Sequence, residues 1–273
     1  MTDGAGAPIR LVLGVDQLAA EGERMMFTVG VFDGLHRGHR YLLGRLRLAA
    51  RRANARPAVV TFDAHPDAVV RGHAPALLLD QEERLGRLAR AGISTVVVQH
   101  FDDALRRTPY DGFVAALSAR IELAGFVMTP EAAFGHERRG TPEALAGLGR
   151  QRGFHVVVVQ PYALDGGPVR SDRIRGLVER GDLVEARRLL GRRPSVVGHP
   201  VPTGASLAEV RPTVPMALPP DGRYRAVGCA PWTAFGPGDG RTAAFKAVVE
   251  GGRLLVPERI ARRHPGGLRV AIG

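Results

Sequence analysis

The sequence lacks the features of several large protein classes. Cys229 is its only cysteine, which excludes an internal disulfide and a thiolate metal cage. No apolar run approaches the roughly 18 residues of a transmembrane helix. The N-terminal segment MTDGAGAPIR lacks the basic and apolar regions of a signal peptide. We therefore expect a cytoplasmic protein that does not bind membranes.

Lysine and aromatic residues are scarce, although the chain is strongly basic. The net charge is +11, yet Lys246 is the only lysine and aromatic residues make up 5%. Residues 1–190 carry 26 basic and 22 acidic groups, whereas residues 191–273 carry 12 and 5. Long basic runs are absent, and few aromatic rings are available for base stacking. The composition is typical of a GC-rich genome and argues against nucleic-acid binding.

What the chain does contain is typical of a globular protein with a sizeable core. It has 273 residues, of which 45% are hydrophobic and 24% charged, so one large domain or two smaller ones are expected. Continuous apolar runs, typical of strands buried on both faces, occur at 26–31, 57–61, 94–99, 125–128 and 155–160. Capping patterns between and after them predict helices that begin at Asp80, Thr108, Thr141, Ser171 and Asp182. This alternation predicts an α/β fold with a Rossmann-like doubly wound parallel sheet, which binds ligands at the carboxyl ends of its strands.

The character of the sequence changes near residue 192. Proline and glycine become dense, and short strands are predicted at 224–229, 245–250, 253–256 and 268–272. The segment Glu250-Gly251-Gly252-Arg253 predicts a hairpin turn. We therefore expect an α/β domain over residues 1–192 and a smaller β-barrel-like domain over residues 193–273.

The most informative motif is FDGLHRGH, residues 32–39, directly after the first predicted strand. Its histidines, His36 and His39, lie three residues apart at the start of a predicted helix and therefore on one face. The free N–H groups of a helix start favour an anion, and a glycine permits its close approach. The motif predicts a polyphosphate site; alternatively, two surface histidines simply begin a helix. No Walker loop is present.

The motif and the segments that follow it resemble a known family. An HxGH sequence after the first strand is typical of the nucleotidyltransferase superfamily, and FDGxHxGH resembles the prokaryotic bifunctional FAD synthetases (riboflavin kinase/FMN adenylyltransferase). Further resemblance comes, in the family's order, from TFDAHP at 61–66, the segment 133–140, VRSDRIR at 169–175 and the segment 181–192. The resemblance covers about residues 25–192.

The resemblance implies that the phosphate of FMN attacks the α-phosphorus of ATP, giving FAD and pyrophosphate. It implies catalytic roles for His36, His39, Ser171 and Arg173, and nucleotide binding by Phe32, Gly34, Gly38 and Arg175. It implies acceptor binding by Asp63, His65, Glu131 and Phe134. Mg²⁺ is expected to accompany ATP, bound mainly through phosphate oxygens. The chain itself is expected to form no separate metal site.

Departures from the family pattern leave other functions open. Thr129, Glu131 and Ala132 replace a glycine, an aspartate and a phenylalanine, while Arg170 and Asp172 replace a serine and a threonine. A different phosphorylated acceptor is therefore an alternative, as is a non-catalytic flavin- or nucleotide-binding protein. Residues 201–214 also lack the family's GFPTAN stretch, so riboflavin kinase activity is not expected.

Overall fold

The computed structural model describes residues 9–18, 22–204, 206–231 and 242–273. The chain forms two compact units, each built from separate segments. Unit 1 comprises Met1–Phe32, Gly38–Pro75 and Leu88–Tyr162; unit 2 comprises Asp33–Arg37, Ala76–Arg87 and Ala163–Gly273. The domain boundary predicted at residue 192 lies within unit 2. That two domains meet at this residue stays a prediction.

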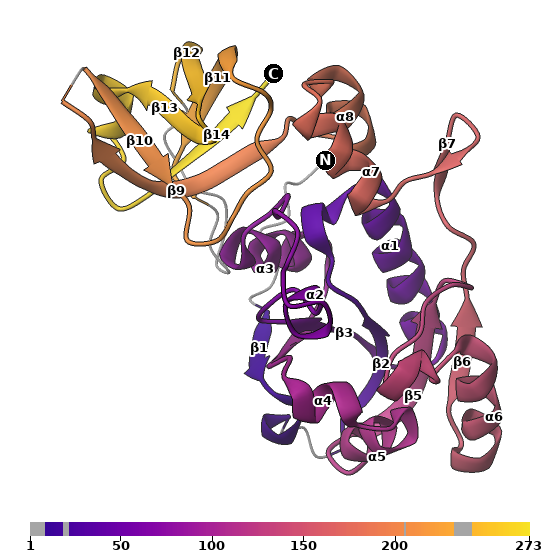
Figure 1. The fold of residues 1–273 in the computed structure, drawn as a ribbon. Coiled ribbons are helices and arrows are strands. Elements are labelled where there is room, and N and C mark those ends of the chain that lie inside the picture. The colour runs from indigo at the N-terminus through magenta and orange to yellow at the C-terminus, as the bar shows by residue number, and fades with distance from the viewer. Residues whose placement is uncertain (1–8, 19–21, 205, 232–241) are drawn as a thin grey trace. The chain divides into compact units, whose positions relative to one another are not determined.

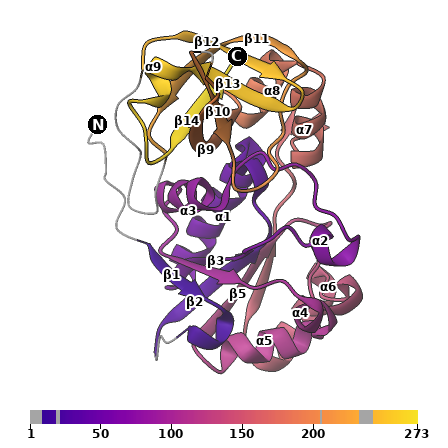
Figure 2. The same ribbon diagram turned by 60° about the vertical axis from the view of Figure 1, so that its left-hand side comes forward.

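Unit 1 contains a six-stranded parallel sheet (Figures 1 and 2). Its strands, in spatial order, are β1 (Arg10–Leu13), β4 (Thr95–Gln99), β3 (Arg56–Phe62), β2 (Arg24–Val29), β5 (Glu122–Met128) and β6 (His155–Val158). The chain order reverses between β2 and β5, which is the topological switch point where doubly wound sheets bind ligands. The predicted doubly wound sheet is confirmed. No strand was predicted at β1, which has only four residues.

Helices cover both faces of this sheet. They are α1 (Arg37–Arg52), α2 (Asp67–Val70), α4 (Asp103–Arg107), α5 (Tyr110–Ser118) and α6 (Pro142–Arg152). Helices α5 and α6 insert Val114, Leu117 and Leu145 into a core that also contains Phe27 and Phe126 of the strands. Helix α1 lies on the opposite face (Figures 1 and 2). This burial of apolar side chains on both faces is why the strands read as continuous apolar runs.

Gly125 allows close approach between β5 and the edge strand β6. Its φ is +147°, and a Cβ there would collide with the His155 carbonyl of β6. The pairing of β2 with β5 shifts register beside it, between Met25 and Met26. Only glycine fits this irregular point without strain.

Unit 2 contains a closed six-stranded antiparallel barrel. Around the barrel lie β10 (Leu207–Arg211), β13 (Arg253–Pro257), β12 (Phe245–Glu250), β11 (Gly222–Cys229), β14 (Leu268–Ile272) and β9 (Ser195–Pro202). The four predicted strands and the Gly251–Gly252 hairpin are confirmed. Unit 2 also holds the start of α3 (Gln81–Arg90), the hairpin β7 (Ala163–Leu164) and β8 (Gly167–Pro168), α7 (Ser171–Glu179), α8 (Leu183–Leu190) and α9 (Glu258–Ala261).

Two of the predicted helix caps are wrong. Asp80, Thr141 and Asp182 cap their helices as expected, each accepting a main-chain N–H three residues later. Thr108 instead directly follows α4 as its C-cap, and its hydroxyl donates to the Ala104 carbonyl of that helix. Ser171 is the first helical residue of α7 and does not cap it. Its hydroxyl donates to the distant Asp33 carbonyl instead.

None of the described helices combines the length and the apolar character that crossing a membrane requires.

Candidate active site

A pocket of about 710 Å³ opens at the carboxyl ends of the strands of unit 1. Val29 ends β2 and Gly30 follows it, Phe62 ends β3, Phe101 lies just after β4, and Met128 ends β5. The pocket therefore lies at the switch point of the sheet. Its volume is within the roughly 300–1,000 Å³ typical of small-molecule sites.

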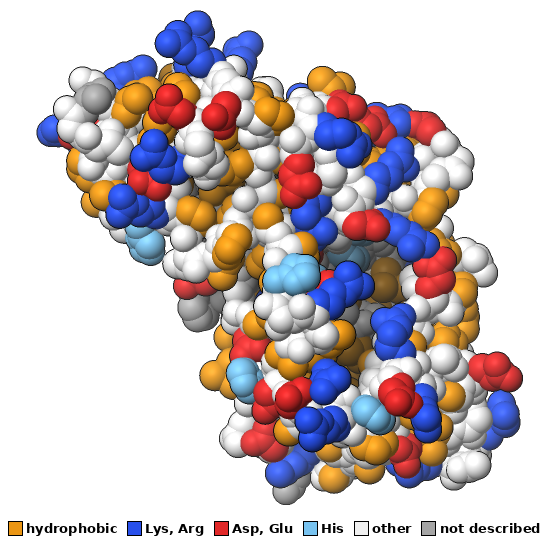
Figure 3. Space-filling view, in the orientation of Figure 1, with side chains coloured by type: hydrophobic (Ala, Val, Ile, Leu, Met, Phe, Trp, Pro, Cys, Tyr) orange, Lys and Arg blue, Asp and Glu red, His pale blue; other side chains and the backbone are white. Residues whose placement is uncertain are grey.

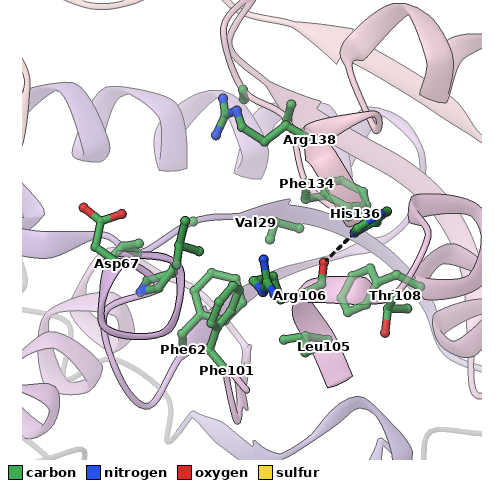
Figure 4. A pocket seen from close by; sticks show the side chains of 18 of the residues that line it. Val29, Phe62, Asp67, Phe101, Leu105, Arg106, Thr108, Phe134, His136 and Arg138 are labelled. Atoms are coloured by element: carbon green, nitrogen blue, oxygen red, sulfur yellow. Dashed lines mark hydrogen bonds between the residues drawn. The ribbon is translucent and has the colours of Figure 1, made fainter. Parts of the chain in front are cut away.

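Aromatic side chains form two opposite walls of this pocket. Phe62 and Phe101 meet edge to face, with ring centroids 5.2 Å apart. On the other side lies Phe134, which packs edge to face against Phe113 at 5.5 Å. Figure 4 shows the Phe62–Phe101 pair on one side and Phe134 on the other, with Val29 between them. Such walls suit a flat apolar ring system.

Cationic side chains lie around the same pocket. Arg71 is 3.6 Å from Asp67, and Arg106 is 2.8 Å from Asp103. Arg138 donates to the main-chain carbonyl of Glu131 at 3.0 Å, and no carboxylate of the described residues pairs with it. Figure 3 shows Lys and Arg side chains spread over the visible face rather than gathered in one place. Arg138 is therefore the pocket arginine best placed to accept an anionic group of a ligand.

The predicted acceptor residues occupy different places around this pocket. His65 and Phe134 line it, whereas Asp63 and Glu131 are outside its lining. Asp63 pairs with the exposed His100, Oδ2 to Nδ1 at 2.5 Å, and also accepts the main-chain N–H groups of Ala64 and Phe101. Partial burial acts to raise the pKa of Asp63, but these hydrogen bonds lower it overall. Asp63 thus stabilises the connection between the ends of β3 and β4.

The histidines of the FDGLHRGH motif flank the start of α1. His36 is buried and directly precedes the helix, while His39 is its third residue. The His39 ring packs edge to face against Phe32, with centroids 5.2 Å apart. Phe32 has a φ of +54°, a conformation uncommon for a residue with a side chain. A tight turn therefore places His36 directly before the first residue of α1.

Asp33, directly after Phe32, accepts three hydrogen bonds that hold this turn, and Arg175, one of the donors, makes a further bond to Ala76. Its Oδ1 accepts the Leu78 N–H at 2.9 Å, and its Oδ2 accepts Nη2 of Arg175 at 2.9 Å. Its main-chain carbonyl accepts the Ser171 hydroxyl, also at 2.9 Å. Arg175 Nε donates to the Ala76 carbonyl at 2.6 Å. Burial raises the pKa of Asp33, although the Leu78 N–H and the Arg175 guanidinium act to lower it.

The remaining predicted residues lie in this turn, at the start of α1 and in α7. Gly34 has a φ of +76°, and a Cβ there would lie 3.0 Å from a Leu78 methyl group. Gly38 is the second residue of α1. Arg173 lies on the exposed side of α7, and its Nη2 is 3.5 Å from Glu185. Arg173 thus has a solvent-facing guanidinium that a ligand phosphate can reach.

The described residues contain no group of three His, Cys, Asp or Glu side chains arranged to hold a metal ion. The oxygens of Asp33 are occupied by protein donors, and those of Asp63 likewise. Both carboxylates thus already have hydrogen-bond donors from the protein.

Several pocket residues were missed by the sequence reasoning. Phe101 lies just after β4, Arg106 lies in α4, and His136 lies in the short helix η3 (His136–Arg138) after β5. The His136 ring is 3.4 Å from the Arg106 carbonyl (Figure 4). Their position after the carboxyl ends of parallel strands was the signal that could have found them.

The chain is similar to known proteins in both sequence and fold. The family profile described as FAD synthetase matches residues 18–173. The bifunctional riboflavin kinase/FMN adenylyltransferase of Escherichia coli (strain K12) is 29% identical over 196 residues, which cover 71% of this chain and 63% of the relative. A relative from Geobacillus thermodenitrificans is 31% identical over 165 residues, covering 60% of this chain and 88% of its own. The chain thus matches less than two thirds of the length of the Escherichia coli relative.

A solved structure shares the whole fold. The crystal structure described as a macrolide-efflux protein from Streptococcus pneumoniae has a TM-score of 0.78 and 21% identity, and the match covers 97% of this chain and 98% of that one. At this identity the likeness concerns the fold alone. The family profile, in contrast, covers more than half of the chain together with its FDGLHRGH motif, and on that ground this chain belongs to the FAD synthetase family.

Proposed function

We propose that the chain is an FMN adenylyltransferase, which transfers AMP from ATP to FMN and releases pyrophosphate. The observation that carries this proposal is the aromatic-walled pocket at the switch point of a sheet that also bears the FDGLHRGH motif. The enzyme would act in the cytoplasm on ATP and FMN.

The pocket of unit 1 is the proposed acceptor site. The flat ring of FMN would lie between the Phe62–Phe101 pair and Phe134, which supply apolar contact area. Arg138 would bind the acceptor's phosphate, because a guanidinium matches phosphate oxygens in geometry and charge. His65, which also lines the pocket, would add a polar side chain near the bound acceptor.

The FDGLHRGH motif and Arg173 are the proposed phosphate-binding elements. A phosphate oxygen of FMN forms a bond to the α-phosphorus of ATP, and the bond from that phosphorus to the bridging oxygen breaks. Negative charge accumulates on the departing pyrophosphate. His36 and His39 would donate hydrogen bonds to it, Gly38 at the helix start would allow its close approach, and Arg173 would balance its charge. Mg²⁺ held by the phosphates would screen the same charge.

The experiment is incubation of the purified chain with ATP, Mg²⁺ and FMN, followed by separation of flavins and measurement of pyrophosphate. We expect FAD and pyrophosphate in equal amounts, and His39→Ala should lower kcat about a hundredfold, as loss of one charge-stabilising donor does. His199→Ala, an exposed histidine on the barrel, is the matched control. The proposal fails if the wild-type chain forms neither product.

A second candidate is a nucleotidyltransferase for another phosphorylated acceptor. It is favoured by Ala132, which lines the pocket where the family pattern has a phenylalanine and so leaves one wall with less aromatic surface. Pyrophosphate release measured with ATP and CTP across several phosphorylated acceptors, FMN included, separates the two candidates.

A further inference from the structure

The outer side of helix α1 carries charge of one sign only. Six of its 16 residues are arginines, all of them exposed, and the helix contains no aspartate or glutamate. Helices α3, α4, α8 and α9, in contrast, each pair an arginine with a carboxylate one turn away. Among the described residues no carboxylate pairs with an arginine of α1. The positive charge of this helix is therefore uncompensated.

Two large apolar side chains lie among these arginines. Tyr41 and Leu48 are 40% and 37% exposed, and their spacing of seven residues places them on the same side of the helix, two turns apart. The Tyr41 ring lies 5.7 Å from that of Tyr162, measured between centroids, which supports it at the surface. Exposed apolar side chains that lie in line indicate an interaction surface more than scattered ones do.

Gly44 lies between these two side chains on the same side of the helix. Glycine is unfavourable in a helix interior because it loses more conformational freedom than alanine. A Cβ at this position would meet nothing within 4 Å in the described chain, and the φ of Gly44 is not positive, so the fold itself does not require glycine here. A small residue on the surface of a helix does allow a second helix to pack close to its main chain.

Three kinds of partner fit this combination poorly. A second copy of α1 would bring arginines against arginines, and like charges oppose association. An anionic membrane binds a helix through a wide apolar face, but the wide apolar face of α1 is buried in the protein. Nucleic acid would pair its phosphates with the arginines without using Gly44 or Leu48. A helix with carboxylates beside an apolar stripe, in contrast, matches the charge, the apolar side chains and the glycine together.

We propose that the outer side of α1, formed by Tyr41, Gly44, Arg45, Leu48 and Arg52, docks an acidic amphipathic helix of a partner protein. The partner helix crosses α1 at Gly44, and its apolar stripe packs on Tyr41 and Leu48. Arg45 and Arg52 pair with carboxylates beside that stripe. This docking does not depend on the adenylyl transfer proposed above, so either can fail without the other.

The test measures binding of two fluorescent helical peptides to the full chain by anisotropy. Each has about three seven-residue repeats with its leucines in line. Glutamates flank the leucines in one peptide, and lysines flank them in the other. We expect the glutamate peptide to bind about tenfold more tightly or better. Combining Arg45→Glu with Arg52→Glu should invert this preference, whereas Arg150→Glu, at an exposed position of α6, should leave it unchanged.

Gly44→Gln tests the crossing point, because glutamine favours a helix and the variant therefore keeps its fold. We expect affinity for the glutamate peptide to fall about tenfold. Gly147→Gln is the control in α6, where an added Cβ meets only an arginine side chain at 3.7 Å. Equal affinity of the wild-type chain for the two peptides, or undiminished binding by Gly44→Gln, would overturn the proposal. Tighter binding to a single-stranded oligonucleotide or to phosphatidylserine vesicles would also overturn it, as would a dimer in sedimentation that Gly44→Gln abolishes.

Discussion

Arg269 and Glu83 form a buried ion pair, with Nε 2.6 Å from Oε1. Arg269 lies on barrel strand β14 and Glu83 in the first turn of α3, and their side chains are 13% and 1% exposed. Glu83 also pairs with Arg87 at 2.5 Å. Loss of one partner from a buried carboxylate leaves its charge poorly compensated, which is a large cost in a protein interior.

We therefore expect Arg269→Met to lower the free energy of unfolding by about 3 kcal/mol. Arg262→Met is the control, because Arg262 pairs with Glu258 while 76% exposed, and such surface pairs contribute below about 1 kcal/mol. Urea denaturation followed by circular dichroism gives both values. Equal effects of the two substitutions would contradict the importance given to the buried pair.

Gly34→Ala should destabilise the chain through both backbone strain and collision. The position has a φ of +76°, and the new Cβ would lie 3.0 and 3.2 Å from two Leu78 carbons. We expect the free energy of unfolding to fall by about 2–4 kcal/mol, of which backbone strain alone accounts for about 1–2 kcal/mol.

The matched control for this change is Gly153→Ala. Gly153 ends α6 with a φ of +80°, but nothing lies within 4 Å of its added Cβ. The free energy of unfolding of this variant should therefore fall by about 1–2 kcal/mol, because only the backbone strain acts. Thermal unfolding of the two variants measures the difference, and a Gly34 variant as stable as the Gly153 variant would refute the close contact with Leu78.

The Asp63–His100 pair predicts a pH-dependent contribution to stability. The hydrogen bond and the charge of Asp63 raise the pKa of His100. A raised histidine pKa gives stabilisation that is complete below about 6.5 and is lost as the pH rises through the raised value. The lowered pKa of Asp63 gives stabilisation above about 3.9 that is lost as the pH falls through the lowered value.

His100→Gln should accordingly lower the urea midpoint at pH 5.5 and have almost no effect at pH 9. His73→Gln is the control, because His73 is exposed and its Nδ1 contacts a main-chain carbonyl, that of Arg71, instead of a carboxylate. A midpoint difference of the same size at both pH values would show that protonation of His100 does not contribute.

Phe101→Leu should weaken FMN binding without changing ATP binding. The substitution removes the edge-to-face contact with Phe62 and part of one pocket wall. An aromatic pair contributes about 0.5–1.5 kcal/mol beyond its buried area, so we expect the Kd for FMN to rise about 3- to 10-fold. Quenching of flavin fluorescence measures it. Tyr224→Leu, an aromatic side chain on the barrel, should leave the Kd unchanged, and an unchanged Kd in Phe101→Leu would place the flavin elsewhere.

Features set by local chemistry could be predicted from the sequence. The parallel strands of unit 1 are continuous apolar runs because both their faces are buried, and Asp80, Thr141 and Asp182 cap helices through their nearest N–H groups. The FDGLHRGH turn was recognisable because its glycines and histidines are adjacent in the chain.

Features set by distant partners could not be predicted. Strand β9 contains Gly198, Pro200 and Pro202, which argue against a strand, yet Gly198 is needed where β9 crosses close to Arg211. Ser171 resembles a helix cap, but its hydroxyl binds Asp33, 138 residues away. The pocket residue Phe101 has no local signature, since only the sheet order brings it beside Phe62.

The barrel of unit 2 closes on itself through the pairing of β9 with both β10 and β14. A closed barrel presents no open strand edge to neighbouring molecules, and its integrity depends on main-chain pairing rather than on any loop. Its connecting segments can therefore diverge without exposing the protein to aggregation.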